Sequence, residues 1–230
     1  MKAYTIIIPG NEISELGFSN LKQSSEAVGN DFQIKAYEAR PKDTVSIMLE
    51  KKIVWNYPWD QPVRDIATGL LKTPYKTANR NSRISCAITH YELWEKCYTE
   101  NENYLILEHD SIWKKKLEDQ VFQNKNFDIV GINDPRGSTR RSNLFYDLVQ
   151  KKGPTIQRPP MIDEGHVPQG LAGNSAYIMK PSGAKKMLDL VAQFGLWPND
   201  AIMCRQLIPT LGVSKTSFTG VQGLPSTTTL

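Results

Sequence analysis

Two carboxylates stand two positions apart at the end of a short apolar run. The letters YLIL at positions 104–107 lead directly into Glu108, His109 and Asp110. Four consecutive apolar residues favour a buried strand. Side chains of an extended chain alternate between its two faces, so Glu108 and Asp110 are expected to point one way and His109 the other. Such a pair could share a hard cation, Mg²⁺ or Mn²⁺, together with ribose or phosphate oxygens. A helix cap or a solvated turn is the alternative for an acidic strand end.

Apolar strands and helices alternate along the chain, which predicts an α/β fold with a mainly parallel sheet flanked by helices. In an open parallel sheet, ligands bind outside the carboxyl ends of the strands, and Glu108 and Asp110 stand at such an end. The fold therefore places the pair where a ligand would bind. Strands are predicted at 3–9, 32–39, 105–110, 127–134 and 174–180, and helices at 19–29, 81–100, 181–195 and 198–208.

The composition is that of an ordinary globular protein. The chain has 230 residues, of which 40% are hydrophobic and 23% charged, a length that suits one sizeable core. No run of about 18 apolar residues occurs, and the apolar start is too short for a signal peptide or a membrane span. These features predict a cytoplasmic protein without a transmembrane segment. Three cysteines without C-x-x-C spacing favour free thiols over disulfides or a zinc knuckle.

Basic residues are concentrated in the middle third of the chain, although the net charge is only +4. They could attract a phosphate-bearing partner such as a sugar nucleotide, a phosphorylated glycan or nucleic acid, and a solvated basic face is the alternative. The segment 133–173 is rich in Pro, Gly, Arg and Lys and is too long for an idle connection. The clustered basic positions are Lys114, Lys115, Lys116, Arg136, Arg140, Arg141, Lys151, Lys152 and Arg158.

The order of several short motifs resembles glycosyltransferase family 25. Members of that family carry G-x-I-G-C-x-x-S-H before a helix with L-W, then a strand ending in E-D-D, then G-x-x-A-Y and P-x-D segments. This chain has SRISCAITHYELW at 82–94, YLILEHD at 104–110, GNSAYIMKPSGAKKML at 173–188 and WPND at 197–200, with VQGLPSTT near its end. It departs from the family at Ser85, Thr89 and His109, and PGNEISELG stands where the family has N-L-D-R-S-x-x-R.

The resemblance implies a GT-A type fold and an enzyme that transfers a sugar from a nucleotide-diphosphate sugar to a hydroxyl group, with inversion at the anomeric carbon. It also implies a bound Mn²⁺ or Mg²⁺. Asp110 is then the first candidate for metal ligand, and Glu108 is the second ligand or holds the donor ribose. Because His109 replaces only the central position of the acidic motif, the outer pair is kept.

The resemblance also suggests roles outside the acidic strand end. Asp200 matches the family's P-x-D and is the candidate catalytic base, with Asp163, Glu164 and His166 as rivals on the long loop. His90 matches the family's histidine and joins Glu108 among the candidate donor-binding residues. Arg83 could face the diphosphate or form a surface salt bridge, and Asn174 could bind the donor or the acceptor, or only shape a turn.

The domain and acceptor predictions are coarser. We expect one glycosyltransferase domain over 1–230, with a nucleotide-sugar-binding half at 1–132 and an acceptor-binding and catalytic half at 133–230 that carries the long basic loop 133–173. The family's usual acceptor is a glycan or lipopolysaccharide sugar, and the basic loop also allows a hydroxylated base in DNA or a hydroxylysine. The alternative function is a non-catalytic module that binds anions or nucleic acid on a degenerate transferase fold.

Overall fold

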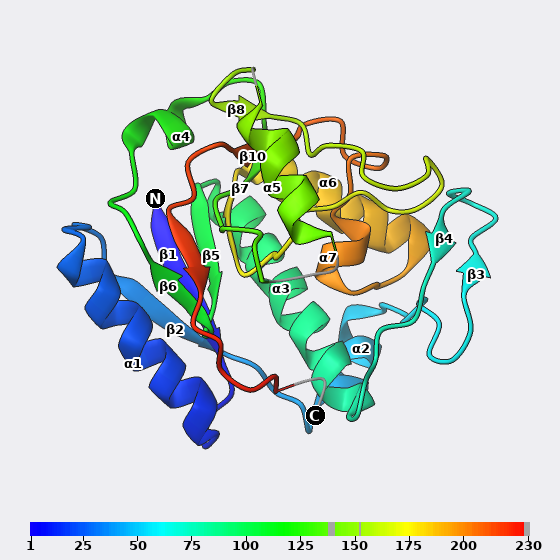
Figure 1. Ribbon diagram of the computed structural model, residues 1–230. Helices are drawn as coiled ribbons and strands as arrows, with labels where there is room; N and C mark the ends of the chain where they lie inside the picture. Colours follow the sequence, from blue (N-terminus) through cyan, green and yellow to red (C-terminus); the bar gives the residue numbers. More distant parts are fainter. Residues whose placement is uncertain (138–140, 152, 228–230) are drawn as a thin grey trace.

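The central sheet explains where the two carboxylates come to lie. In this computed structural model, which describes residues 1–137, 141–151 and 153–227, seven strands form one sheet in the order β2-β1-β5-β9-β7-β10-β8 (Figure 1). β1 runs parallel to β2 and to β5, and β7 runs parallel to β10, whereas β9 is antiparallel between β5 and β7, and β8 is an antiparallel edge strand. The strands are β1 (Lys2–Ile7), β2 (Ile34–Glu38), β5 (Tyr104–Glu108), β7 (Ile129–Gly131), β8 (Ile156–Gln157), β9 (Ala176–Met179) and β10 (Leu211–Ser214).

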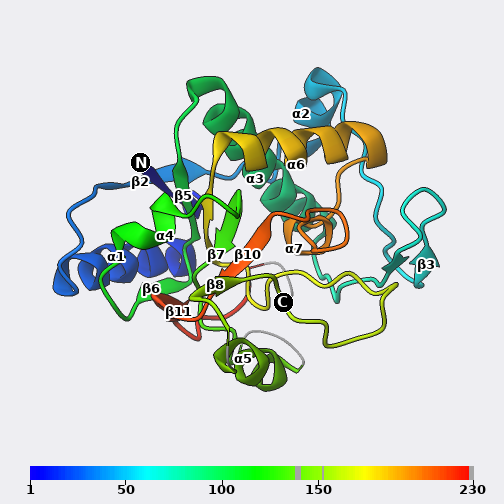
Figure 2. The same cartoon turned by 90° about the horizontal axis from the view of Figure 1, so that it is seen from above.

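Helices cover both faces of this sheet, which confirms the predicted α/β class. Figure 2 shows α1 on one side of the strands and α3 with α6 on the other. Two small antiparallel ribbons complete the structure, β3 (Val63–Arg64) with β4 (Leu71–Lys72) and β6 (Ser111–Trp113) with β11 (Thr219–Val221). The helices are α1 (Glu12–Ala27), α2 (Thr44–Lys51), α3 (Arg80–Glu100), α4 (Asp119–Gln123), α5 (Ser142–Gln150), α6 (Pro181–Phe194) and α7 (Asn199–Ile202).

The strand β5 is buried on both faces and sorts its side chains by strict alternation. Tyr104 and Ile106 belong to the core that includes side chains of α3 and α6, whereas Leu105 and Leu107 belong to the core on the α1 side. All four are fully buried. The next residue, Glu108, therefore faces α3, and the hydrophobic pattern of the strand decides which helix the carboxylate meets.

Two predicted elements fall furthest short of their expected lengths. The helix predicted at 198–208 is helical only over Asn199–Ile202, because the chain then turns to pair Cys204 with Gly170 and to donate the Arg205 N–H to the carbonyl of Gln169. The strand predicted at 127–134 is confined to Ile129–Gly131. The three cysteines are free, as predicted. Within the described ranges, no helix is long and apolar enough to cross a membrane.

The turn that carries His109 and Asp110 packs against a glycine of α1. A Cβ atom at Gly17 would lie 2.5 Å from the carbonyl oxygen of His109, closer than any real contact allows. The opposing atom belongs to the backbone, so it cannot move aside as a flexible side chain would. Gly17 thus lets α1 approach the acidic turn.

We predict that Gly17→Ala destabilises the protein by about 1–2 kcal/mol. A clash with a backbone atom places the cost in the upper part of the roughly 1–3 kcal/mol of overpacking, and the gain in helix propensity offsets about 1 kcal/mol of it. Chemical denaturation measures this free energy of unfolding. Ser19→Ala, at an exposed position of the same helix, is the control and should change it by less than about 0.5 kcal/mol. A Gly17→Ala variant more stable than the wild type would contradict the packing argument.

Candidate active site

A cavity of about 470 Å³ opens at the carboxyl ends of β1 and β5. Its volume lies in the range of pockets that bind small ligands. Because β9 is antiparallel to β5, its first residues reach the same edge, and Ser175 accepts hydrogen bonds from the Glu108 N–H (2.8 Å) and the Ser111 hydroxyl (2.6 Å). The lining residues are Ile6, Ile8, Ala39, Pro41, Ser82, Arg83, Ser85, Cys86, Glu108, His109, Asp110, Gly137, Gly173, Asn174, Ser175, Asn199, Asp200, Val221, Gly223, Leu224, Pro225, Ser226 and Thr227.

The structure brings most of the predicted site residues together in this cavity. The lining residues include Arg83, Glu108, Asp110, Asn174 and Asp200. His90 lies behind them, fully buried. The segment 133–173, predicted as one long loop, contains α5 and β8. The rival bases on this segment are absent from the described lining; among them, Asp163 pairs with Arg141, and Glu164 lies 3.4 Å from His166.

The strand alternation that predicted opposite directions for His109 and the two carboxylates does not extend to His109. β5 ends at Glu108, and His109 and Asp110 form a turn, so strand geometry no longer decides where their side chains point. His109 lines the cavity together with both carboxylates. Burial lowers the pKa of His109, although the charge of Glu108 opposes this, and the neutral imidazole is favoured.

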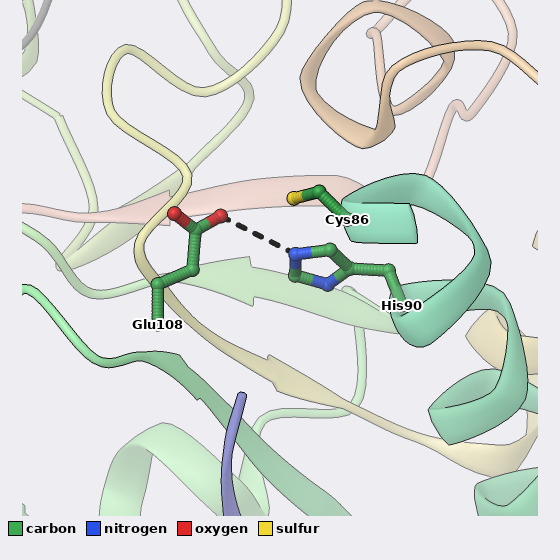
Figure 3. Close-up of side chains that lie close together, drawn as sticks. All are labelled: Cys86, His90 and Glu108. Atoms are coloured by element: carbon green, nitrogen blue, oxygen red, sulfur yellow. Dashed lines mark hydrogen bonds and ion pairs between the residues drawn. The ribbon is translucent and has the colours of Figure 1, made fainter. Parts of the chain in front are cut away.

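A series of polar contacts holds Glu108, and Figure 3 shows the last of them, between His90 and Glu108. The Trp94 indole N–H donates to the Tyr177 hydroxyl oxygen over 2.9 Å, that hydroxyl lies 2.8 Å from His90 Nδ1, and His90 Nε2 lies 3.3 Å from Glu108 Oε1. If the Tyr177 hydroxyl donates to Nδ1, the imidazole proton is on Nε2 and donates to Glu108. Each contact in this series then joins a hydrogen-bond donor to an acceptor. Asn199 Nδ2 lies 3.1 Å from Nε2, so in this tautomer the Asn199 amide has to be turned over for its oxygen to face the Nε2–H.

The two carboxylates differ in their affinity for a proton. Burial opposes the ionisation of Glu108, but the hydrogen bond from His90 and the nearby positive charges hold the pKa of Glu108 below its usual value. Burial, and then the negative charge of Glu108, raise the pKa of Asp110 to about 7. At neutral pH, Glu108 is therefore an anion and Asp110 is partly protonated.

Several cavity oxygens lack a protein partner. Asp110 Oδ1 is buried, and in the part of the chain that the structure describes it has no hydrogen-bond partner; the same holds for Asn174 Oδ1 and Ser175 Oγ. Buried acceptors without partners are costly unless a ligand or ion satisfies them. Carboxylate and amide oxygens are the donors that Mg²⁺ and Mn²⁺ prefer, so the residues present fit a hard divalent cation.

Asp200 stands on α7 beside two groups that offset its burial. Burial raises the pKa of Asp200, while the positive charge of Arg83 and a hydrogen bond from Tyr75 act in the opposite direction. The Arg83 guanidinium also lies over the Tyr75 ring, 5.1 Å from its centroid. Sequence reasoning missed Tyr75, because no spacing in its irregular segment connects it to Asp200.

Gln222 ties the acidic turn to both ends of the chain. Its backbone N–H donates to the Asp110 carbonyl (2.7 Å), and its side-chain amide nitrogen lies within hydrogen-bond distance of the carbonyls of Gly17 (2.8 Å), His109 (3.1 Å) and Ser111 (2.8 Å). Asn20 donates to its amide oxygen over 2.9 Å. Gln222 was not among the predicted site residues, although the family-like VQGLPSTT contains it.

Acidic residues pair with part of the basic middle segment. Lys114 Nζ and Arg136 Nη2 lie 3.0 and 2.8 Å from Asp134 Oδ2, and Arg141 pairs with Asp163. These ion pairs reduce the positive charge available to a phosphate-bearing partner. Arg140 and Lys152 of the predicted clusters lie outside the described residues.

The two carboxylates lie in a cavity at the carboxyl ends of the strands. This is the edge of the sheet at which α/β proteins bind their ligands. The sequence model of glycosyltransferase family 25 (LPS biosynthesis protein) matches residues 35–203, well over half of the chain. The chain therefore belongs to glycosyltransferase family 25 and is a glycosyltransferase.

Solved structures resemble the chain only distantly. The galactosyltransferase LgtC, in complex with donor and acceptor sugar analogues, has 10% sequence identity and a TM-score of 0.47, over 98% of this chain and 88% of that one. Mouse xyloside xylosyltransferase 1, in its apo form, has 9% identity and a TM-score of 0.44, over 88% and 80% of the two chains. No curated protein matches the chain in sequence. Likenesses this distant do not identify the chemistry.

We predict that Gln222→Ala weakens divalent-cation binding at the acidic turn, because the turn loses an amide whose two N–H bonds are shared among the carbonyls of Gly17, His109 and Ser111. Gln206→Ala is the matched control, since Gln206 also donates to two loop carbonyls (Gly165 and Val167) and accepts the Gln169 N–H. Calorimetric titration with Mn²⁺ should show a loss of roughly threefold or more in affinity for Gln222→Ala alone, a change of about 0.6 kcal/mol. Equal losses in both variants would indicate a general effect of stability instead.

Proposed function

We propose that this glycosyltransferase depends on a divalent cation and transfers a sugar from a nucleotide-diphosphate sugar to a glycan hydroxyl, with inversion at the anomeric carbon. The observation that carries the proposal is the buried, unpartnered Oδ1 of Asp110 beside Glu108, within the described walls of a cavity of about 470 Å³. Family membership supplies the reaction class, and this arrangement supports the proposal that the donor diphosphate and its cation bind here.

Asp110 and Glu108 would hold the cation, Mn²⁺ or Mg²⁺, with the Asn174 amide oxygen as a further candidate. A bound divalent cation would stabilise the negative charge that develops on the departing nucleoside diphosphate. Burial, and then the negative charge of Glu108, raise the pKa of Asp110, so both oppose full ionisation of the pair without a cation. Cation binding and full ionisation of Asp110 are therefore expected to accompany each other.

The other lining residues suggest how the donor is oriented. Arg83 stands where it can contact a diphosphate oxygen, while its contacts with Thr77 and the Lys76 carbonyl hold its guanidinium in place. His90 does not line the cavity, so its proposed part in donor binding is indirect, through Glu108. The cavity takes residues from 1–132 and from 133–230, which agrees with the proposed donor and acceptor halves meeting there.

Asp200 is the proposed base that accepts the proton of the acceptor hydroxyl. A carboxylate with a raised pKa is a better proton acceptor than one at its ordinary value, and burial gives Asp200 that property. A single displacement assisted by one base on the acceptor side inverts the anomeric configuration. The donor cation and the base are thus proposed to act from different elements, the β5 turn and α7.

A glycan hydroxyl is the acceptor we propose, in keeping with the family's description as an LPS biosynthesis protein. A hydroxylated base in DNA and a hydroxylysine have less support, because acids pair with several of the basic residues that suggested them. A cytoplasmic location stays a prediction from the sequence.

We predict that Asp110→Ala abolishes metal-dependent nucleotide binding. Calorimetric titration of UDP, GDP and ADP, each with and without Mn²⁺, should identify one nucleotide whose affinity rises with the cation in the wild type. In Asp110→Ala that gain should fall at least about tenfold, or about 1.4 kcal/mol. Asp31→Ala, an exposed aspartate between α1 and β2, is the control and should behave as the wild type. A wild type with no cation-dependent binding to any nucleotide would refute the proposal.

For Asp200→Asn we predict nearly unchanged nucleotide binding and a transfer rate lower by about 10²–10⁴-fold, the usual contribution of a general base. The measurement pairs the same calorimetric titration with a product assay on a panel of sugar acceptors. The anomeric configuration of the wild-type product, read from its NMR coupling constants, should be opposite to that of the donor. Retention of configuration would remove the role assigned to Asp200.

A further inference from the structure

Three potential metal ligands of different chemistry meet at one wall of the cavity. Figure 3 shows Cys86 and His90 reaching from α3 toward Glu108 at the end of β5. The sulfur, one imidazole nitrogen and one carboxylate oxygen all lie within 4.8 Å of one another. We propose that Cys86, His90 and Glu108 form a second metal site for a soft transition-metal ion such as Zn²⁺, whose occupancy withdraws Glu108 from the donor cation. The inhibitory part of this inference rests on the proposed function.

The spacing of the ligands suits a small tetrahedral ion. Cys86 and His90 are four residues apart on α3 and so project from the same face of the helix. His90 Nε2 and Glu108 Oε1 are 3.3 Å apart. Zinc bonds to nitrogen and oxygen of about 2.0–2.1 Å, at a tetrahedral angle, place two such atoms roughly 3.3 Å apart. The Cys86 sulfur needs to move closer, and the Asn199 amide, 3.1 Å from Nε2, needs to move aside. Because Cys86 and Glu108 line the cavity, water or substrate could then take the fourth position.

The surroundings of His90 also suit a metal ligand. A ligating histidine usually donates its other ring N–H to an oxygen that fixes the ring, and Tyr177 Oη lies 2.8 Å from Nδ1. The phenolic oxygen has two lone pairs, so it can accept from Nδ1 and from the Trp94 indole. On metal binding, the imidazole proton moves from Nε2 to Nδ1, and the Cys86 thiol loses its proton to solvent. The balance is therefore one proton released for each ion bound.

The two sites share one ligand but prefer different ions. Thiolate and imidazole select zinc and related ions, whereas Mg²⁺ and Mn²⁺ prefer oxygen ligands. If the ion at the second site draws the Glu108 carboxylate toward His90, Glu108 can no longer bind the donor cation beside Asp110. Zinc is therefore expected to oppose cation-dependent nucleotide binding, even though it does not occupy the position assigned to Mn²⁺.

Cobalt offers a direct test, because a thiolate bound to Co²⁺ gives a charge-transfer absorption in the near ultraviolet that oxygen and nitrogen ligands do not give. Titrating the wild type with Co²⁺ should produce this band, and Zn²⁺ should remove it. The band should be lost in Cys86→Ser and kept in Cys97→Ser, a matched change at a buried cysteine of the same helix. Cys86→Ala serves if Cys86→Ser does not fold. A band that survives the loss of Cys86, or no band in the wild type, would overturn the site.

A second measurement separates this inference from the proposed function. With Zn²⁺ at about ten times its own Kd, competition should raise the apparent Kd of the Mn²⁺-dependent nucleotide about tenfold in the wild type. In Cys86→Ser, the same Zn²⁺ concentration should cause less than about a tenth of that rise in apparent Kd. The rise is measured against the affinity of the same variant without zinc. If the nucleotide binds in a Mn²⁺-dependent way but no cobalt band depends on Cys86, the second metal site is refuted and the proposed function stands. If the cobalt band depends on Cys86 but no nucleotide binds in a Mn²⁺-dependent way, the proposed function is refuted and the second metal site stands.

Discussion

The contact between His90 and Glu108 joins α3 to the end of β5, and the arrangement of the cavity depends on it. Glu108 meets His90 because strict alternation along β5 turns Tyr104, Ile106 and then Glu108 toward the α3 side of the sheet. A shift of one residue in the register of β5 would turn the carboxylate toward α1 instead. The apolar side chains therefore do more than fill the core. Their order decides that the last residue of the strand lies against a buried imidazole.

That contact also makes the two carboxylates unequal. Glu108 receives a hydrogen bond and stays ionised, and its charge then makes ionisation of the buried Asp110 harder. The acidic turn can thus persist without a cation, because at neutral pH the pair carries less than two full charges. The folded state holds Asp110 in an environment that a divalent cation would improve, since the cation compensates the charge and satisfies the unpartnered oxygen.

Local patterns predicted the parts of this structure that depend on local physics. The apolar runs indicated the sheet, the helical spacing indicated α3, and the family-like motifs pointed to Arg83, Glu108, Asp110, Asn174 and Asp200, all of which line one cavity. The errors arose where distant contacts decide. Alternation was extended to His109 and Asp110, although the strand ends at Glu108, two residues before its predicted end. Tyr75 was missed, and the helix after Trp197 was drawn too long, because contacts with Asp200 and Gln169 leave no local trace in the sequence.

The departure from the family's opening motif has a structural counterpart. Where family members carry N-L-D-R-S-x-x-R, this chain has PGNEISELG, and within that stretch Asn11 caps α1 by accepting the Ser14 N–H over 3.0 Å, while Gly17 allows α1 to touch the His109 carbonyl. From the other end of the chain, Gln222 reaches the same carbonyl and that of Gly17. The acidic turn is thus held between the first helix and the last strand. Because these contacts are made to backbone carbonyls, a glycine and one side-chain amide position the turn in this chain.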